Sequence, residues 1–122
     1  MDIHYQFSPI HGSLTRTEYK PGEFYIAGLL DKSKYNERNH CIFKSYDGIT
    51  VEVIQIAGVL AKRIEILDKK KKNYHVGEPY GIIHFGSRVD TIVPNSVGNR
   101  SFKLLVKEGE KLRGFNTKLG LY

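Results

Sequence analysis

The chain has 122 residues, of which 40% are hydrophobic and 26% are charged, as is ordinary for a single soluble domain. No run approaches the ~18 apolar residues of a membrane-spanning helix, and the N-terminus lacks the regions of a secretory signal, so we expect one cytoplasmic domain, residues 1–122. The formal net charge of +6 favours an anionic partner, either nucleic acid or an acidic membrane surface. The single cysteine, Cys41, excludes an internal disulfide, and its apolar neighbours predict a buried structural thiol.

Short runs of β-branched and aromatic residues between frequent turn signals predict an all-β fold of short antiparallel strands, as a barrel or a sandwich. Asp47-Gly48 is a strong hairpin signal between two of these runs. In chain order, the expected strands are residues 12–19, 24–29, 38–46, 49–57, 61–67, 80–93 and 101–107.

Three similar phrases, YKPGEFYIAG, NYHVGEPYG and VKEGEKLRG, each place Gly-Glu ahead of a second glycine. Glycines at such offsets predict tight turns that need positive φ. The repetition resembles the turn pattern of the barrel-sandwich hybrid found in biotinyl and lipoyl carrier domains. A carrier function is not expected, because the carrier's modified lysine is usually flanked by methionine and the only methionine here is Met1.

Ser87 carries the most specific chemistry, because it follows a glycine inside the strand expected at residues 80–93. A serine Oγ can attack the preceding carbonyl carbon where the backbone is strained and a proton acceptor is near, and the acyl group then moves from nitrogen to oxygen. β-Elimination of that ester breaks the chain and leaves dehydroalanine, whose hydrolysis gives a pyruvoyl group. A Gly-Ser pair alone is more typical of a β-bulge, so its surroundings decide between the two interpretations.

Four segments supply those surroundings. In chain order they are DIHYQFSPIHGSLTRTEYKPGEF, YNERNH, VIQIAGVLAKRIE and GEPYGIIHFGSRVDTIVP. Together they resemble the phosphatidylserine decarboxylase family, in particular its short, archaetidylserine-decarboxylase-like form. The family's usual segment ahead of Asp-x-His is missing from this sequence, so the resemblance is to an N-terminally shortened member.

The resemblance implies a proenzyme that cleaves itself between Gly86 and Ser87, into residues 1–86 and 87–122. It implies a pyruvoyl group formed from Ser87, which serves as the electron sink when the substrate loses CO2, with no metal and no diffusible cofactor. The implied reaction converts phosphatidylserine, or a related aminophospholipid, to phosphatidylethanolamine at a peripheral membrane surface. His4 is implied to line the active site and to assist decarboxylation or proton return, and the alternative is a frayed terminal histidine.

Two further residues are candidates for substrate binding, each with a structural alternative. Arg88 shares a strand face with Asp90, so it is predicted to bind the substrate's phosphate or carboxylate, or else to pair with Asp90. Gln55 is an amide within an apolar strand, and it is predicted to contact the substrate or to satisfy a neighbouring loop. The polar cluster at residues 36–39 is expected to form a turn that orders nearby backbone.

A second function is open on these residues, that of a catalytically inactive relative which binds lipid or a protein partner. Such a β-domain would bind anionic lipid through the lysines at residues 69–72, although a run of this kind is also typical of a solvated hairpin tip. A homo-oligomer, or a partner that supplies the missing segment, is compatible with either function. A nucleic-acid-binding barrel ranks last, because nothing but charge and tyrosine content favours it.

Overall fold

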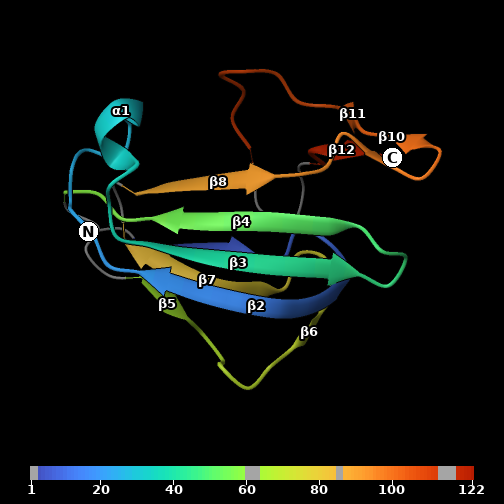
Figure 1. Cartoon of the computed structure of the whole chain (residues 1–122), viewed down its shortest axis with the longest axis horizontal. Helices are drawn as coiled ribbons and strands as arrows, with labels where there is room; N and C mark the ends of the chain where they lie inside the picture. Colours follow the sequence, from blue (N-terminus) through green and yellow to red (C-terminus); the bar gives the residue numbers. More distant parts are fainter. Residues whose placement is uncertain (1–2, 60–63, 85–86, 113–117) are drawn as a thin grey trace.

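The structure, a computed structural model, describes residues 3–59, 64–84, 87–112 and 118–122 (Figure 1). One sheet contains β1 (Ile3–Phe7), β7 (Pro79–His84) and β5 (Ile64–Ile66), in that order. The other contains β6 (Asn73–Tyr74), β2 (Gly12–Lys20), β3 (Arg38–Ser45), β4 (Thr50–Ile56) and β8 (Arg88–Ile92), in that order. All these pairings are antiparallel, and within the described residues neither sheet closes on itself. The prediction of an all-β fold is therefore confirmed, in the open, sandwich-like form.

Two short strand pairs and one helix complete the described structure. β9 (Ser96–Val97) pairs with β10 (Arg100–Ser101), and β11 (Lys103–Leu104) pairs with β12 (Gly120–Leu121). The helix α1 spans only Leu30–Ser33. Within the described ranges, no helix has the length and apolar character needed to cross a membrane.

The strands expected at residues 12–19, 38–46 and 49–57 are confirmed as β2, β3 and β4. The hairpin between β3 and β4 is confirmed too, since Gly48 has a φ of +92° and the Ser45 N–H donates to the Ile49 carbonyl at 2.8 Å.

Other expectations are wrong or hold only in part. Residues 24–29 form no strand, because the side-chain amide of Asn36 bonds both backbone groups of Tyr25 and leaves them unavailable to a neighbouring strand. The run 80–93 is two strands, β7 and β8, which pair in different sheets. Residues 101–107 contribute only short pieces, β11 and the end of β10. The strand expected at 61–67 is β5, and its first three positions lie outside the described residues.

The glycine turns follow the predicted pattern at two of three places. Gly77 and Gly109 have positive φ angles of 85° and 84°, which side chains rarely adopt. Gly22 has no such angle, and it is required for a different reason. A Cβ there would lie 2.3 Å from the carbonyl oxygen of Tyr35, so the two chain segments can approach only over a glycine.

Both sheets contribute to one apolar core. The Phe43 ring lies edge-on to Tyr80 of the opposite sheet, with ring centroids 4.9 Å apart. Cys41 lies in this core with no exposed surface, and burial raises the pKa of its thiol to about 12. The prediction of a buried structural thiol is therefore confirmed.

A buried amide joins the two sheets at the other end of the interior. The Gln55 Nε2 group donates to Gln6 Oε1 at 2.9 Å, and the Asn39 Nδ2 group donates to Gln55 Oε1 at 3.1 Å. Gln55 has no exposed surface. Gly81 makes room for this amide, because a Cβ there would lie 2.6 Å from Gln55 Nε2.

We predict that Gly81→Ala lowers the free energy of unfolding by about 1–3 kcal/mol, because the added methyl displaces the Gln55 amide from its partners. The matched control is Gly28→Ala, whose added methyl meets nothing within 4 Å, and it should change stability by less than about 1 kcal/mol. Urea denaturation of both variants measures the difference. Equal midpoints would show that the amide bridge does not constrain the packing of the sheets.

Candidate functional site

Ser87 lies where the chain passes from one sheet to the other. β7 ends at His84 in the first sheet and β8 begins at Arg88 in the second (Figure 1). Ser87 is half-buried and precedes the first paired residue of β8, so it does not belong to a regular ladder. Gly86, the other half of the predicted cleavage site, lies outside the described residues. We call this place the β7–β8 corner, meaning Ser87 together with the ends of the two strands.

Hydrogen bonds at the end of the neighbouring strand, β4, fix the surroundings of the corner. Arg88 pairs with Ile56, the last residue of β4. The next residue, Ala57, donates its N–H to the Glu37 carbonyl at 2.9 Å and accepts a bond of 2.7 Å from Asn36 Nδ2. Asn36 is almost completely buried. Asn36 thus orders nearby backbone as predicted, but the expected turn at residues 36–39 is wrong, because Arg38 and Asn39 already pair in β3.

Arg88, the residue directly after Ser87, is bound by internal partners. Its Nη1 group donates to the Ala27 carbonyl and to the Ser33 hydroxyl, both at 2.7 Å. Its Nε lies 3.0 Å from Asp90 Oδ1, an ion-pair distance at which the N–H does not point along a hydrogen bond, and Nη2 donates to Oδ2 at 3.3 Å. These contacts favour the predicted pair with Asp90 over substrate binding. They give Arg88 a positioning role, because they fix the backbone beside Ser87.

The register of β1 brings His4 to the same corner. His4 pairs with Ile83, and Ile3 pairs with His84, so the first residues of β1 run alongside the last residues of β7. The N-terminal strand therefore meets β7, about 80 residues later in the sequence, within a few positions of Ser87. Only the register allows this, since no local pattern links residue 4 to residue 87.

Gln55 pairs with Val89 in the ladder beside the corner, but its amide faces inward. Both ends of that amide have protein partners, and the side chain is inaccessible. The structure thus favours the alternative in which Gln55 satisfies neighbouring groups over the one in which it contacts substrate.

Ala27 and Ser33, the partners of Arg88, are the site residues that sequence reasoning missed. Both are buried, and Ser33 lies in α1. Ala27 lies in the strand expected at residues 24–29 and Ser33 lies outside every expected strand, and no local signal marks a carbonyl and a hydroxyl as the partners of a distant guanidinium.

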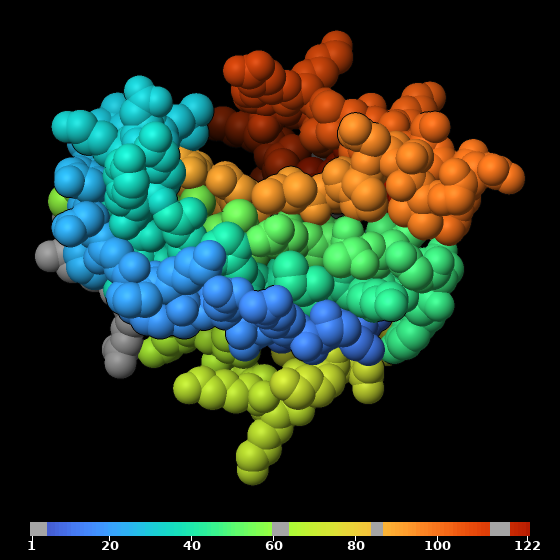
Figure 2. Space-filling view, in the orientation of Figure 1, coloured from blue at the N-terminus to red at the C-terminus, as the bar shows by residue number. Residues whose placement is uncertain are grey.

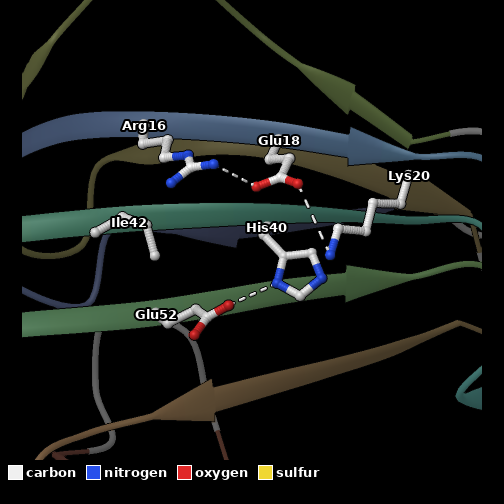
Figure 3. A pocket seen from close by; sticks show the side chains of 6 residues that line it. All are labelled: Arg16, Glu18, Lys20, His40, Ile42 and Glu52. Carbon is white, nitrogen blue, oxygen red and sulfur yellow. Dashed lines mark hydrogen bonds and ion pairs between the residues drawn. The ribbon is translucent and has the colours of Figure 1, made fainter.

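A separate charged pocket of about 260 Å³ lies on the outer face of the larger sheet (Figure 3). His40 Nδ1 lies 2.6 Å from Glu52 Oε1, and Arg16 lies 2.8 Å from Glu18. Its charged groups pair with one another, and Ser87 is not among the residues that line it. Among the described residues, no group of three or more histidine, cysteine and carboxylate side chains is placed to hold a metal ion.

The described residues define an all-β protein of open antiparallel sheets, in which Ser87 lies where the chain passes from one sheet to the other. The chain belongs to the phosphatidylserine decarboxylase family, whose sequence profile matches residues 1–118. The family resemblance seen in the sequence is confirmed.

Similar proteins carry the name phosphatidylserine decarboxylase proenzyme. The one from Rhodococcus jostii is 40% identical over 117 residues, which are 96% of this chain and 47% of that protein. The one from Burkholderia multivorans is 39% identical over 118 residues, 97% of this chain and 53% of that protein. The one from Syntrophus aciditrophicus is 35% identical over 121 residues, 99% of this chain and 54% of that protein. The chain spans about half the length of these curated relatives. No solved structure matches it.

We predict that Arg88→Lys lowers the free energy of unfolding by about 1–3 kcal/mol, because one ammonium cannot reach Ala27, Ser33 and Asp90 together. The matched control is Arg100→Lys, since the Arg100–Asp47 pair is exposed and its loss should change stability by less than about 1 kcal/mol. Hydrogen exchange should accelerate at the β8 amides in the first variant alone. An equal response of the two variants would refute the positioning role of Arg88.

Proposed function

We propose that this chain, or the longer protein of which it is a part, is a pyruvoyl-dependent phosphatidylserine decarboxylase that forms by self-cleavage between Gly86 and Ser87. The observation that carries the proposal is the position of Ser87, half-buried and outside any ladder, at a crossing between two sheets. Family membership supports it, because the relatives are named proenzymes.

The corner suits such a cleavage because the chain is held on both sides of it. β7 is paired with β1 and β5 as far as its last residues, and β8 is fixed by its pairing with β4 and by Arg88. Ser87, between these anchors, is not restrained by a ladder of its own. The reacting serine is therefore positioned by its neighbours while its own backbone has room to rearrange.

The proposed cleavage proceeds in three steps, which are an acyl shift, an elimination and a hydrolysis. The Ser87 Oγ, losing its proton to a base, attacks the Gly86 carbonyl carbon, and the C–N bond breaks to give an ester and a free Ser87 amine. Removal of the Ser87 Cα proton then expels Gly86 as a carboxylate and leaves dehydroalanine. Water hydrolyses its imine tautomer, ammonia leaves, and a ketone remains at the new N-terminus of the second chain.

The two chains stay together after cleavage, because β8 remains paired with β4 along Arg88–Ile92. The residue that bears the ketone is thus held at the corner by the Arg88 contacts and by the bond from Asn36 to Ala57 beside it. The pyruvoyl group, once formed, would supply an electrophilic carbonyl carbon that bonds the substrate's amine with loss of water, and it would thereby act as the sink for the electron pair left by CO2. We assign His4 the return of a proton to the substrate carbon, since its strand borders the corner and imidazole exchanges protons near neutral pH.

We predict that the purified protein separates under denaturing conditions into fragments of about 10 and about 4 kDa, which are the shares of the 14.0 kDa chain on either side of the Gly86–Ser87 bond. Intact-mass spectrometry should identify a pyruvoyl terminus on the smaller fragment. Ser87→Ala should remain a single chain, and Ser101→Ala, at an exposed serine, should cleave normally. A wild-type chain that stays intact and contains no borohydride-sensitive carbonyl would instead support the inactive, lipid- or partner-binding relative.

We predict that His4→Ala still cleaves but releases CO2 from a short-chain phosphatidylserine about 100-fold more slowly, as expected for the loss of a general acid–base group. The control is His75→Ala, at an exposed loop position away from the corner, and it should retain the wild-type rate. An unchanged rate in His4→Ala would make His4 a terminal residue without a catalytic role.

A further inference from the structure

A protruding apolar segment lies next to the β7–β8 corner. We call it the knuckle and define it as residues 25–35, which include α1. Figure 2 shows it as a projection at one end of the molecule. Five of its large side chains have between 41% and 70% of their surface exposed, namely Tyr25, Ile26, Leu29, Leu30 and Tyr35.

The knuckle holds these side chains on an ordered frame. The Leu29 N–H donates to the Ile26 carbonyl at 3.0 Å, and the Ser33 N–H donates to the Leu29 carbonyl at 2.9 Å. Asn36 binds both backbone groups of Tyr25, and Arg88 binds Ala27 and Ser33. A backbone whose polar groups are satisfied while its leucines face solvent is typical of an interaction surface.

The charged and aromatic residues of the knuckle indicate what that surface contacts. Lys32 Nζ lies 5.8 Å from the centroid of the Tyr25 ring, and Lys34 Nζ lies 5.2 Å from that of Tyr35. Asp31 is the single acidic residue, so two lysines against one aspartate leave the knuckle one positive charge. Aliphatic tips flanked by tyrosine and lysine suit the interface of an anionic bilayer, whereas lysine is depleted in protein–protein interfaces.

We propose that the knuckle inserts its apolar tips into the headgroup region of an anionic phospholipid bilayer and so holds the β7–β8 corner at the lipid surface. The connection is direct, because Arg88 binds the knuckle with one end of its side chain and its backbone follows Ser87. The biological purpose of this docking rests on the proposed function, but the docking itself is measured without catalysis.

The lysines at residues 69–72 are a weaker candidate for the same contact. Lys71 is paired with Glu78, and Asp68 adjoins the run. Their loop, between β5 and β6, lies on the side of the molecule opposite α1 in Figure 1. One flat bilayer therefore cannot contact both surfaces, and variants can distinguish them.

The test is co-sedimentation of the full chain with vesicles of phosphatidylcholine alone and with vesicles that also contain phosphatidylserine. We expect binding to the second kind, weakened but not abolished by salt. The double variant Ile26→Ser/Leu30→Ser should lose on the order of tenfold or more in binding, as expected from the apolar area withdrawn from the bilayer. Leu104→Ser, which is comparably exposed but lies away from the knuckle, should bind as the wild type does. Lys32→Gln/Lys34→Gln should weaken binding more than Lys69→Gln/Lys72→Gln.

Three outcomes would overturn the proposal. They are an unchanged affinity of the Ile26→Ser/Leu30→Ser variant, an equal loss in Leu104→Ser, and a loss confined to the 69–72 variant. Concentration-dependent self-association that the knuckle variant abolishes would assign the surface to a second copy instead.

The Ser87→Ala variant separates this test from the proposed function, since it should bind vesicles fully while remaining uncleaved. Conversely, a wild type that cleaves and decarboxylates a monomeric short-chain lipid but ignores vesicles would refute the docking surface alone.

Discussion

The structure depends on one topological constraint, which is that a single short stretch of chain joins the edge of the five-stranded sheet to the centre of the three-stranded one. β7 is held between β1 and β5, and β8 is added to the outer side of β4. Ser87 occupies this stretch, and the Arg88 contacts fix its downstream end. Under the proposed function, the reacting serine lies where the fold itself interrupts regular pairing.

The interior beside this crossing differs from the rest of the core. Aromatic and aliphatic side chains around Phe43 fill the end near the β3–β4 hairpin, whereas the amides of Gln6, Gln55 and Asn39 occupy the end near the corner. Buried amides are costly unless each finds its partner, so they tolerate only one alignment of the two sheets. Gly81 shows how tight that alignment is, because any side chain there would displace Gln55. The proposed self-cleavage at the crossing needs this accuracy more than it needs additional apolar packing.

Arg88 connects the crossing with the outer surface of the molecule. Through Ala27 and Ser33 it holds the knuckle, and through its backbone it adjoins Ser87. A single side chain therefore links the proposed lipid-facing surface to the proposed reactive residue. This arrangement explains why an arginine follows the serine, since a guanidinium has several donors and can hold both the knuckle and β8 at once.

The sequence by itself determined the class of fold and most of the tight turns, and it singled out Ser87 as the candidate for unusual chemistry. β-Branched runs and glycine turns act over a few residues, so β2, β3, β4 and the Asp47-Gly48 hairpin were predictable. Family membership was likewise predictable, because the family's motif around Ser87 consists of consecutive residues. The tertiary structure decided that residues 80–93 divide between two sheets, that residues 24–29 follow Asn36 instead of forming a strand, and that Gln55 binds Gln6. It also decided that His4 borders the corner and that Arg88 binds Ala27 and Ser33. Each of these depends on which distant groups a buried polar atom or a strand edge meets, and no local propensity specifies that.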